Sequence, residues 1–304
     1  MHDALFENYE KQVWELAGII PGSEGVRMRA LKEAVKLGLP TRRDEDWRYS
    51  DVKFLHESVF NASQKPQNAH VEAIPVVGEY SARLVFVNGY FDEELSDYAD
   101  FLNVANVRPL ANHLISNPDR IDEIVAGGDS IALLNTALMS GGLVISLPAN
   151  VHVEKPLEIV NFSTGTEQFS NHIRHVLEIG EAASLKVIEN FVGVSVSGNY
   201  WNNSVVQARI SEEGRLVHSR IQDEGEHAFH TAKSYVSLDA GATYSCSNLM
   251  IGAKVARFEG HVKIMGEGAR ATIDGVALAG NVVTVWVGFR DKLELFPLHI
   301  LWRK

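Results

Sequence analysis

The chain has a single cysteine, Cys246, among 304 residues, so it cannot form an internal disulfide bond, and we expect a reducing, cytoplasmic environment. It has no apolar run of the roughly 18 residues that span a bilayer, and its first residues lack the basic start and apolar core of a secretory signal. It also lacks an excess of positive charge: 28 Lys and Arg face 39 Asp and Glu, a formal net charge of -11. That sign disfavours nucleic acid and anionic membranes as partners.

Motifs for nucleotide binding and hydrolysis are missing as well. The chain contains no P-loop, no Gly-x-Ser-x-Gly and no His-Glu-x-x-His. Residues 266–271 (Gly-Glu-Gly-Ala-Arg-Ala) fit a loose dinucleotide fingerprint, but that motif needs a following helix to face the pyrophosphate. Residues 272–274 are instead typical of a strand. We therefore predict no enzyme activity, no catalytic residue and no cofactor bound by this chain alone.

What the sequence does contain is an internal repeat between about residues 172 and 280. Four times, a strand-like alternation is followed by a short turn rich in glycine and acidic residues and then by a second strand. Gly214, Gly241 and Gly268 of these turns are 27 positions apart. A unit with one apolar face must stack on its neighbours to bury that face. The repeat predicts a parallel β-solenoid, right-handed by default, with an antiparallel two-layer sandwich as the alternative.

The first 140 residues have a mixed, mainly helical pattern. Helical spacing predicts helices over residues 6–20 and 26–37, with Ser23 as the N-cap of the second. A loop over residues 61–70, a β-hairpin around Asn88-Gly89 and helices near residues 111–125 and 131–139 follow. From residue 141 the pattern is β-type, so the predicted fold class is α+β. The predicted regions are a helical or mixed region (1–140), a β-helix core (141–280) and an atypical tail (281–304).

Two histidine pairs suggest a metal site. His172 and His175 lie in a strand-like run, where a spacing of three places side chains on opposite faces, so we expect that they do not bind one ion together. His227 and His230 lie near a predicted turn at residues 224–226, where the geometry is looser. The simpler interpretation of this second pair is polar surface or partner contact. No residue is assigned to a metal.

The remaining candidates are one thiol and three carboxylates. Iron–sulfur clusters typically take four thiolates, which Cys246 cannot supply alone, so we predict a small buried residue there. Asp223, Glu224 and Asp239 suggest a general acid–base pair, as in β-helical polysaccharide enzymes, or else solvated turns.

The densest charged and aromatic cluster is residues 41–49, which contains Trp47, Arg48 and Tyr49. It predicts an aromatic anchor whose arginines pair with the acidic residues at 44–46. The alternative is a partner-binding face, since Trp, Tyr and Arg dominate interface hot spots.

These same residues resemble a known family. Residues 39–50 (Leu-Pro-Thr-Arg-Arg-Asp-Glu-Asp-Trp-Arg-Tyr-Ser) resemble the N-terminal signature of SufD proteins, in the SufB/SufD family of the SUF iron–sulfur assembly system. Residues 86–91, 134–137 and 142–148 look like the segments that follow, and the resemblance covers about residues 1–280. It implies a right-handed parallel β-helix behind an N-terminal helical region. It also implies a non-catalytic scaffold subunit that pairs with a SufB-like paralogue and a SufC-like ATPase.

After residue 280 the resemblance ends. The family continues with more β-helix and a C-terminal helical region that docks SufC, and its functional histidine lies there, so no functional residue is transferred. We expect a truncated or frame-shifted C-terminus, with an uncapped sheet edge and an aggregation-prone run over residues 282–289. Two other functions stay open: a β-helical polysaccharide lyase or hydrolase, and a purely structural solenoid module.

Overall fold

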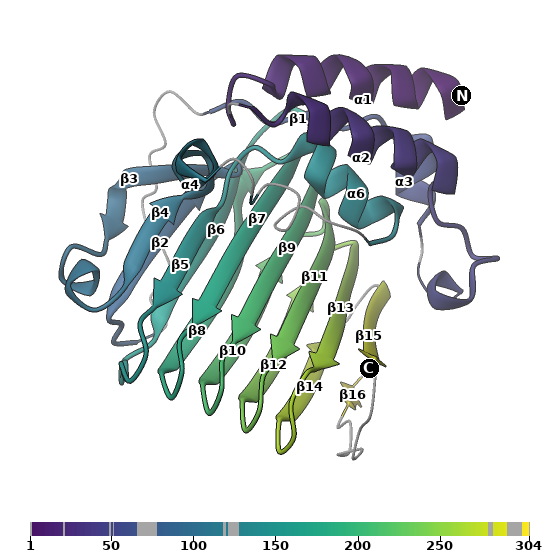
Figure 1. The fold of residues 1–304 in the computed structure, drawn as a ribbon. Helices are drawn as coiled ribbons and strands as arrows, with labels where there is room; N and C mark the ends of the chain where they lie inside the picture. The colour runs from purple at the N-terminus through teal and green to yellow at the C-terminus, as the bar shows by residue number, and fades with distance from the viewer. Residues whose placement is uncertain are drawn as a thin grey trace.

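The computed structural model of the chain describes residues 2–20, 22–48, 50, 52–65, 78–117, 120, 128–278, 282–290 and 300–303. Its main body is a solenoid built from two eight-stranded sheets, with a layer of helices against one of them (Figure 1). None of the described helices is long and apolar enough to cross a membrane.

The sheet that carries the helices is called sheet A, and the other is sheet B. Sheet A consists of β1 (Asn61–Ala62), β4 (Asn106–Pro109), β5 (Leu143–Leu147), β7 (Phe169–Ile179), β9 (Tyr200–Ile210), β11 (Ala228–Leu238), β13 (Val255–Ile264) and β15 (Val282–Arg290). Sheet B consists of β2 (Ala82–Val87), β3 (Tyr90–Asp97), β6 (Leu157–Gly165), β8 (Ser184–Val196), β10 (Arg215–Glu224), β12 (Thr243–Gly252), β14 (Arg270–Leu278) and β16 (Ile300–Arg303).

From β5 onward the chain alternates between the sheets, and each strand from β7 on pairs in parallel with the strand two before it. Among the described strands only the pairs β2–β3 and β4–β5 are antiparallel. The predicted parallel solenoid is thus confirmed, and the antiparallel sandwich is wrong. Strands β2, β3 and β4 join the two sheets ahead of residue 141, so the predicted N-terminal region and core share both sheets. The residue boundaries proposed between regions stay predictions.

One edge of the solenoid is a stack of turns with a shared conformation. Each turn has one residue in the left-handed region, with φ of 62°, 52°, 54°, 65° and 75° at Asn150, Ala182, Glu213, Gly241 and Gly268. The backbone N–H of each of the first four donates to a carbonyl of the next turn, over 2.8–2.9 Å. Register pairs Arg215 with Thr243 and Thr243 with Arg270, so the coil lengthens by one residue relative to the predicted repeat of 27.

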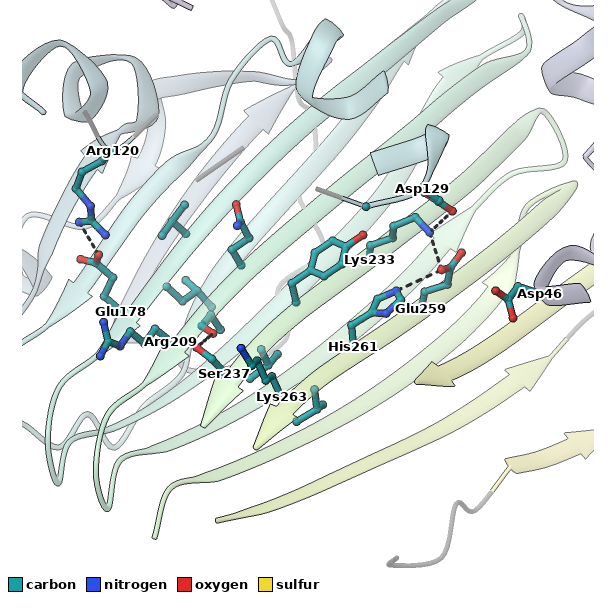
Figure 2. A pocket seen from close by; sticks show the side chains of 18 of the residues that line it. Asp46, Arg120, Asp129, Glu178, Arg209, Lys233, Ser237, Glu259, His261 and Lys263 are labelled. Carbon is teal, nitrogen blue, oxygen red and sulfur yellow. Dashed lines mark hydrogen bonds and ion pairs between the residues drawn. The ribbon is translucent and has the colours of Figure 1, made fainter. Parts of the chain in front are cut away.

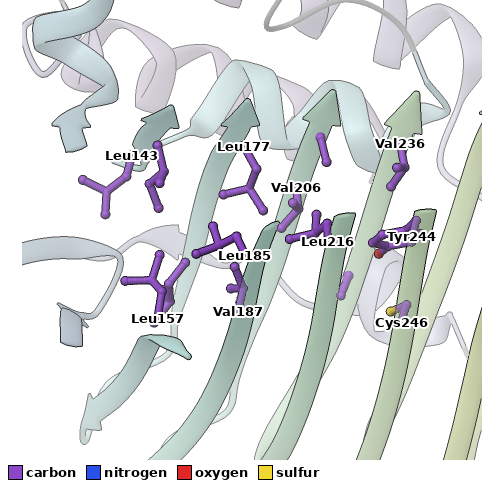
Figure 3. Packing of buried hydrophobic residues seen from close by; sticks show 14 of the residues in the cluster. Leu143, Leu157, Leu177, Leu185, Val187, Val206, Leu216, Val236, Tyr244 and Cys246 are labelled. Carbon is purple, nitrogen blue, oxygen red and sulfur yellow. The ribbon is translucent and has the colours of Figure 1, made fainter. Parts of the chain in front are cut away.

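Between the sheets lies a continuous apolar core. Alternate residues of every long strand point inward, and Figure 3 shows them interleaving: Leu177, Val206 and Val236 from sheet A, and Leu185, Leu216 and Tyr244 from sheet B. Each of these side chains is at most 3% exposed. Cys246 of β12 lies in the same core at 1% exposure, which confirms the predicted small buried residue.

The helical layer covers the outer face of sheet A near the starts of its strands (Figure 1). It consists of α1 (His2–Leu16), α2 (Glu24–Leu37), η1 (Glu45–Trp47), α3 (Lys53–Glu57) and α6 (Ser130–Leu138). Phe54 of α3 stacks on Phe229 of β11 with ring centroids 4.2 Å apart, and meets Trp201 of β9 edge-on. These aromatic contacts bury the apolar face that no single helix could bury alone.

Several predicted N-terminal elements are confirmed and some are corrected. The hairpin at Asn88-Gly89 forms between β2 and β3. Ser23 precedes α2 but does not cap it, since its hydroxyl donates to the Ile20 carbonyl and accepts from Arg27. The predicted loop at 61–70 begins with β1, because Asn61 and Ala62 pair with β7, and residues 66–70 lie outside the described part. The predicted helix at 111–125 is α4 (Leu110–Ser116); residues 118–119 and 121–127 lie outside the described part.

Candidate functional site

An open groove of about 1000 Å³ lies on the outer face of sheet A, where the helical layer ends (Figure 2). Its floor comes from three rows of side chains, each of which crosses β7, β9, β11 and β13 in register. The inner row is Arg174, Val205, Lys233 and Glu259; the middle row is Val176, Gln207, Tyr235 and His261; the outer row is Glu178, Arg209, Ser237 and Lys263. Exposure rises from the inner to the outer row, because the helices cover only the inner one.

The inner row is an ionic network at the edge of the helical layer. Lys233, only 2% exposed, places its Nζ 2.9 Å from Asp129 and 2.6 Å from Glu259. Arg257 donates from Nε to Glu259 over 2.6 Å. Burial alone would raise the pKa of Glu259, but the charges of Lys233 and Arg257 and the nearby His261 outweigh it and hold that pKa well below its usual range. Lys233 is therefore a charge held between two carboxylates.

Trp47 closes the inner end of the groove. The Arg257 guanidinium lies 4.0 Å from the Trp47 ring centroid, and Lys233 lies 5.5 Å from it. Arg257 also donates to Ser50 over 2.9 Å, which ties the segment after Trp47 to β13. Trp47 is 5% exposed, so the predicted aromatic anchor is confirmed for this residue. Tyr49 lies outside the described residues.

The middle row supplies an aromatic floor. Tyr235 and His261 stack with ring centroids 4.8 Å apart and planes 13° apart, and His261 is about one-third exposed (32%). Beside them, Gln207 receives a hydrogen bond of 3.0 Å from Arg174. Arg174 also bonds Asn135 and Thr136 of α6, so one buried guanidinium sets both the helix and the floor.

The outer row is the rim of the groove. Arg209, 71% exposed, lies 3.6 Å from Asp239 in the turn beyond it, and Arg120 lies 2.8 Å from Glu178. Lys263 is exposed at the end of β13. Cations thus gather on the rim, while the carboxylates of Asp46, Asp129 and Glu259 gather on the wall beneath the helices (Figure 2). Such a polarised surface suits the recognition of a ligand or chain with charges of both signs.

The first histidine pair behaves as predicted. His172 points toward the helical layer and meets Trp201 edge-on, whereas His175 points into the core and meets Phe86 edge-on. Burial lowers the pKa of His172 to about 3 and that of His175 to about 4, so both rings are neutral at pH 7. Among the described residues, no group of three His, Cys, Asp or Glu is placed to hold a metal ion.

The second pair and the acidic candidates need corrections. His230 is not a surface residue: it points into the core, with Nδ1 2.8 Å from Glu224. Glu224 is 3% exposed and so is no solvated turn residue, while Asp223 beside it is exposed. Asp239 lies in the turn at the other end of β11, roughly 30 Å away by strand length. The structure does not bring these carboxylates together.

Sequence reasoning missed a buried charged cluster in the core. Glu189 of β8 accepts from Arg220 over 2.5 Å and lies 3.0 Å from the Nε2 of His218. Burial would raise the pKa of Glu189, but Arg220 and His218 lower it to about 2. The available signal was β10 itself, whose inward positions include His218 and Arg220 where an apolar face would place aliphatic residues.

Comparisons with known proteins agree with this architecture. Residues 4–159 match a family model described as the SufBD protein N-terminal region, and residues 162–289 match one described as the SufBD core domain of SUF system FeS cluster assembly. The iron–sulfur cluster assembly protein SufD of Escherichia coli is 25% identical over 254 residues, which are 82% of this chain and 57% of the relative.

Two further relatives show the same proportion. A Synechocystis protein, named as an iron–sulfur cluster assembly SufBD family protein, is 25% identical over 236 residues, 73% of this chain and 52% of the relative. The chloroplastic protein ABCI7 of Arabidopsis thaliana is 24% identical over 239 residues, 75% of this chain and 50% of the relative. The chain spans about half the length of the curated relatives it matches.

Proposed function

Since this chain belongs to the SufB/SufD family, we propose that it is a SufD-like scaffold or accessory subunit of a SUF complex for iron–sulfur cluster assembly. It acts in the cytoplasm through contacts with a SufB-like paralogue and a SufC-like ATPase, which supplies the ATP hydrolysis. It is not itself an enzyme and binds no cofactor alone; the cluster is the cargo of the complex. The observation that carries the proposal is that family models match both the helical layer and the solenoid.

Two kinds of surface support a role in assembly. Strands β15 and β16 are the last strands of sheets A and B, and a last strand offers backbone groups for pairing with another chain. The outer face of sheet A offers the groove, with aromatic rings and arginine of the kind that dominate interface hot spots. The acidic candidates, in contrast, lie apart, as an acid–base pair would not.

Affinity purification tests the proposal. The tagged chain is co-expressed with SufB-like and SufC-like proteins from the same genome, beside a full-length SufD relative as the positive control. We expect both partners to co-elute with the chain in a constant ratio. If the control retains the partners and this chain retains neither, the proposal is wrong.

Complementation separates a working scaffold from a purely structural solenoid. The gene is supplied to a strain that lacks its SufD, and the activity of an iron–sulfur enzyme is followed. We expect restored activity. Binding without restoration would leave an interaction module only, and turnover of acidic polysaccharides by the purified chain would replace the proposal with the enzyme.

A further inference from the structure

The outer face of sheet A is covered over only half of its width. Helix α6 is fixed to the inner row through Arg174, which bonds Asn135 and Thr136, and Lys233 is fixed to Asp129 just before the helix. The middle and outer rows continue the same sheet face beyond this helical layer and line the groove. In layered proteins, a sheet face of this kind is covered by helices packed about 10 Å above it.

The dimensions of the groove match a short helix. Four adjacent strands, β7 to β13, carry the rows, and at about 4.8 Å per strand spacing they span roughly 14 Å. A helix of nine or ten residues, at about 1.5 Å per residue, has that length. The groove volume of about 1000 Å³ lies at the upper limit for small-molecule pockets, which also favours a chain segment.

The charges define what such a helix must carry. Arg209 and Lys263 are exposed on the rim, so they favour acidic side chains on the helix face toward the turns. Asp46 is exposed on the opposite wall beside Asp129, so it favours a lysine or arginine on the other face. Between them, the stacked rings of Tyr235 and His261 offer an apolar and aromatic contact surface.

The mouth of the groove carries one more apolar contact. Leu37, the last residue of α2, lines the groove and is 60% exposed, although most apolar residues of the helical layer are buried. A helix lying in the groove would cover it. Leu37 and the ring pair thus frame an apolar strip with charges of opposite sign on its two sides.

We propose that this groove docks an amphipathic helix of about ten residues, from a SufB-like or SufC-like subunit, with acidic residues on one side of its apolar stripe and basic residues on the other. This inference rests on the proposed function, because the helix belongs to a subunit of the same complex. It adds a docking surface on the face of the solenoid to whatever contacts the strand edges make.

The experiment is site-specific photo-crosslinking in the co-expressed complex. A photoreactive amino acid replaces Ser237, a half-buried residue of the outer row. The matched control replaces Ser245, a half-buried serine on the outer face of sheet B. Mass spectrometry identifies the crosslinked peptide. We expect position 237, and not 245, to link to a single amphipathic segment of one partner subunit.

Charge reversal tests the recognition itself. Arg209→Glu with Lys263→Glu removes the cationic rim, and Arg215→Glu with Arg270→Glu makes the same change at exposed positions of sheet B. Two exposed ion pairs lost together weaken binding of the mapped peptide by about tenfold. We expect that loss for the rim variant only, and recovery when the acidic residues of the peptide are changed to lysine.

The outcomes separate this inference from the proposed function. A complex that co-purifies but gives no crosslink at position 237 overturns the docking helix and leaves the scaffold function standing. So does a crosslink that joins two copies of this chain, or one that charge reversal leaves unchanged. If no complex forms beside a working control, both the function and the docking helix are wrong.

Discussion

The two histidines of β7 make the stability of this protein sensitive to mild acid. Both rings are fully buried and neutral in the folded chain, with pKa values lowered by burial to about 3 for His172 and about 4 for His175. In the unfolded chain a histidine has a pKa near 6.5. Below pH 6.5 the unfolded state therefore binds more protons, and the free energy of unfolding falls until the pH passes through the folded pKa values.

The expected loss is large at pH 5.0. There the folded rings are still neutral while the unfolded ones are almost fully protonated, so each histidine costs about 2 kcal/mol relative to pH 7.5. Together His172 and His175 cost about 4 kcal/mol, against a total stability of about 5–15 kcal/mol for a typical domain. Burial also lowers the pKa of His218, which adds to the loss in the same direction.

The assay is urea unfolding, followed by tryptophan fluorescence, at pH 7.5 and pH 5.0. His172→Gln and His175→Gln each keep a hydrogen-bonding side chain but do not titrate. We expect the loss between the two pH values to shrink by about 2 kcal/mol in each variant and by about 4 kcal/mol in the double variant. His218 is unchanged in all of them and cancels. If the variants lose as much stability as the wild type, the rings are not buried and neutral as described.

Three further substitutions test other parts of the fold. Glu189→Gln leaves Arg220 as a buried unpaired charge and should cost about 3–5 kcal/mol in urea unfolding, whereas Glu189→Leu combined with Arg220→Met should restore most of it. Trp47→Ala should cost about 3–5 kcal/mol and lower the melting temperature, and Trp47→Phe should cost clearly less. In Gly142→Ala the new Cβ would lie 1.7 Å from the Arg174 carbonyl oxygen, so we expect a loss of at least about 3 kcal/mol or no soluble protein. A variant equal to wild type in any of the three would contradict the corresponding contact.

The solenoid could be predicted because its cause is local. Turns with glycine and acidic residues recur at a nearly constant interval, and the alternation between them leaves each unit one apolar face to bury. The same local reasoning placed His172 and His175 on opposite faces of one strand. It also identified Trp47 as an anchor, because a tryptophan among charged residues has few other ways to be buried.

The groove and the charged core cluster could not be predicted because they depend on register between coils. Lys233 meets Glu259 only because β11 and β13 pair with an offset of 26 residues, and Glu189 meets Arg220 across an offset of 31. The turns that set these offsets differ in length by single residues. A shift of one residue would send every side chain to the other face, so an approximate repeat does not determine which residues face one another.

The contact between Arg257 and Ser50 joins residues 207 positions apart in the chain. At about 5–20 residues per second, a ribosome takes roughly 10–40 s to make the intervening segment. During that time Trp47 and the apolar side of the first helices have nothing in place to pack against, since Trp201, Phe229 and Val255 are not yet made. The beginning of this polypeptide must therefore wait, exposed, for its latest coils, and the nascent chain should be a substrate for holding chaperones until β13 emerges.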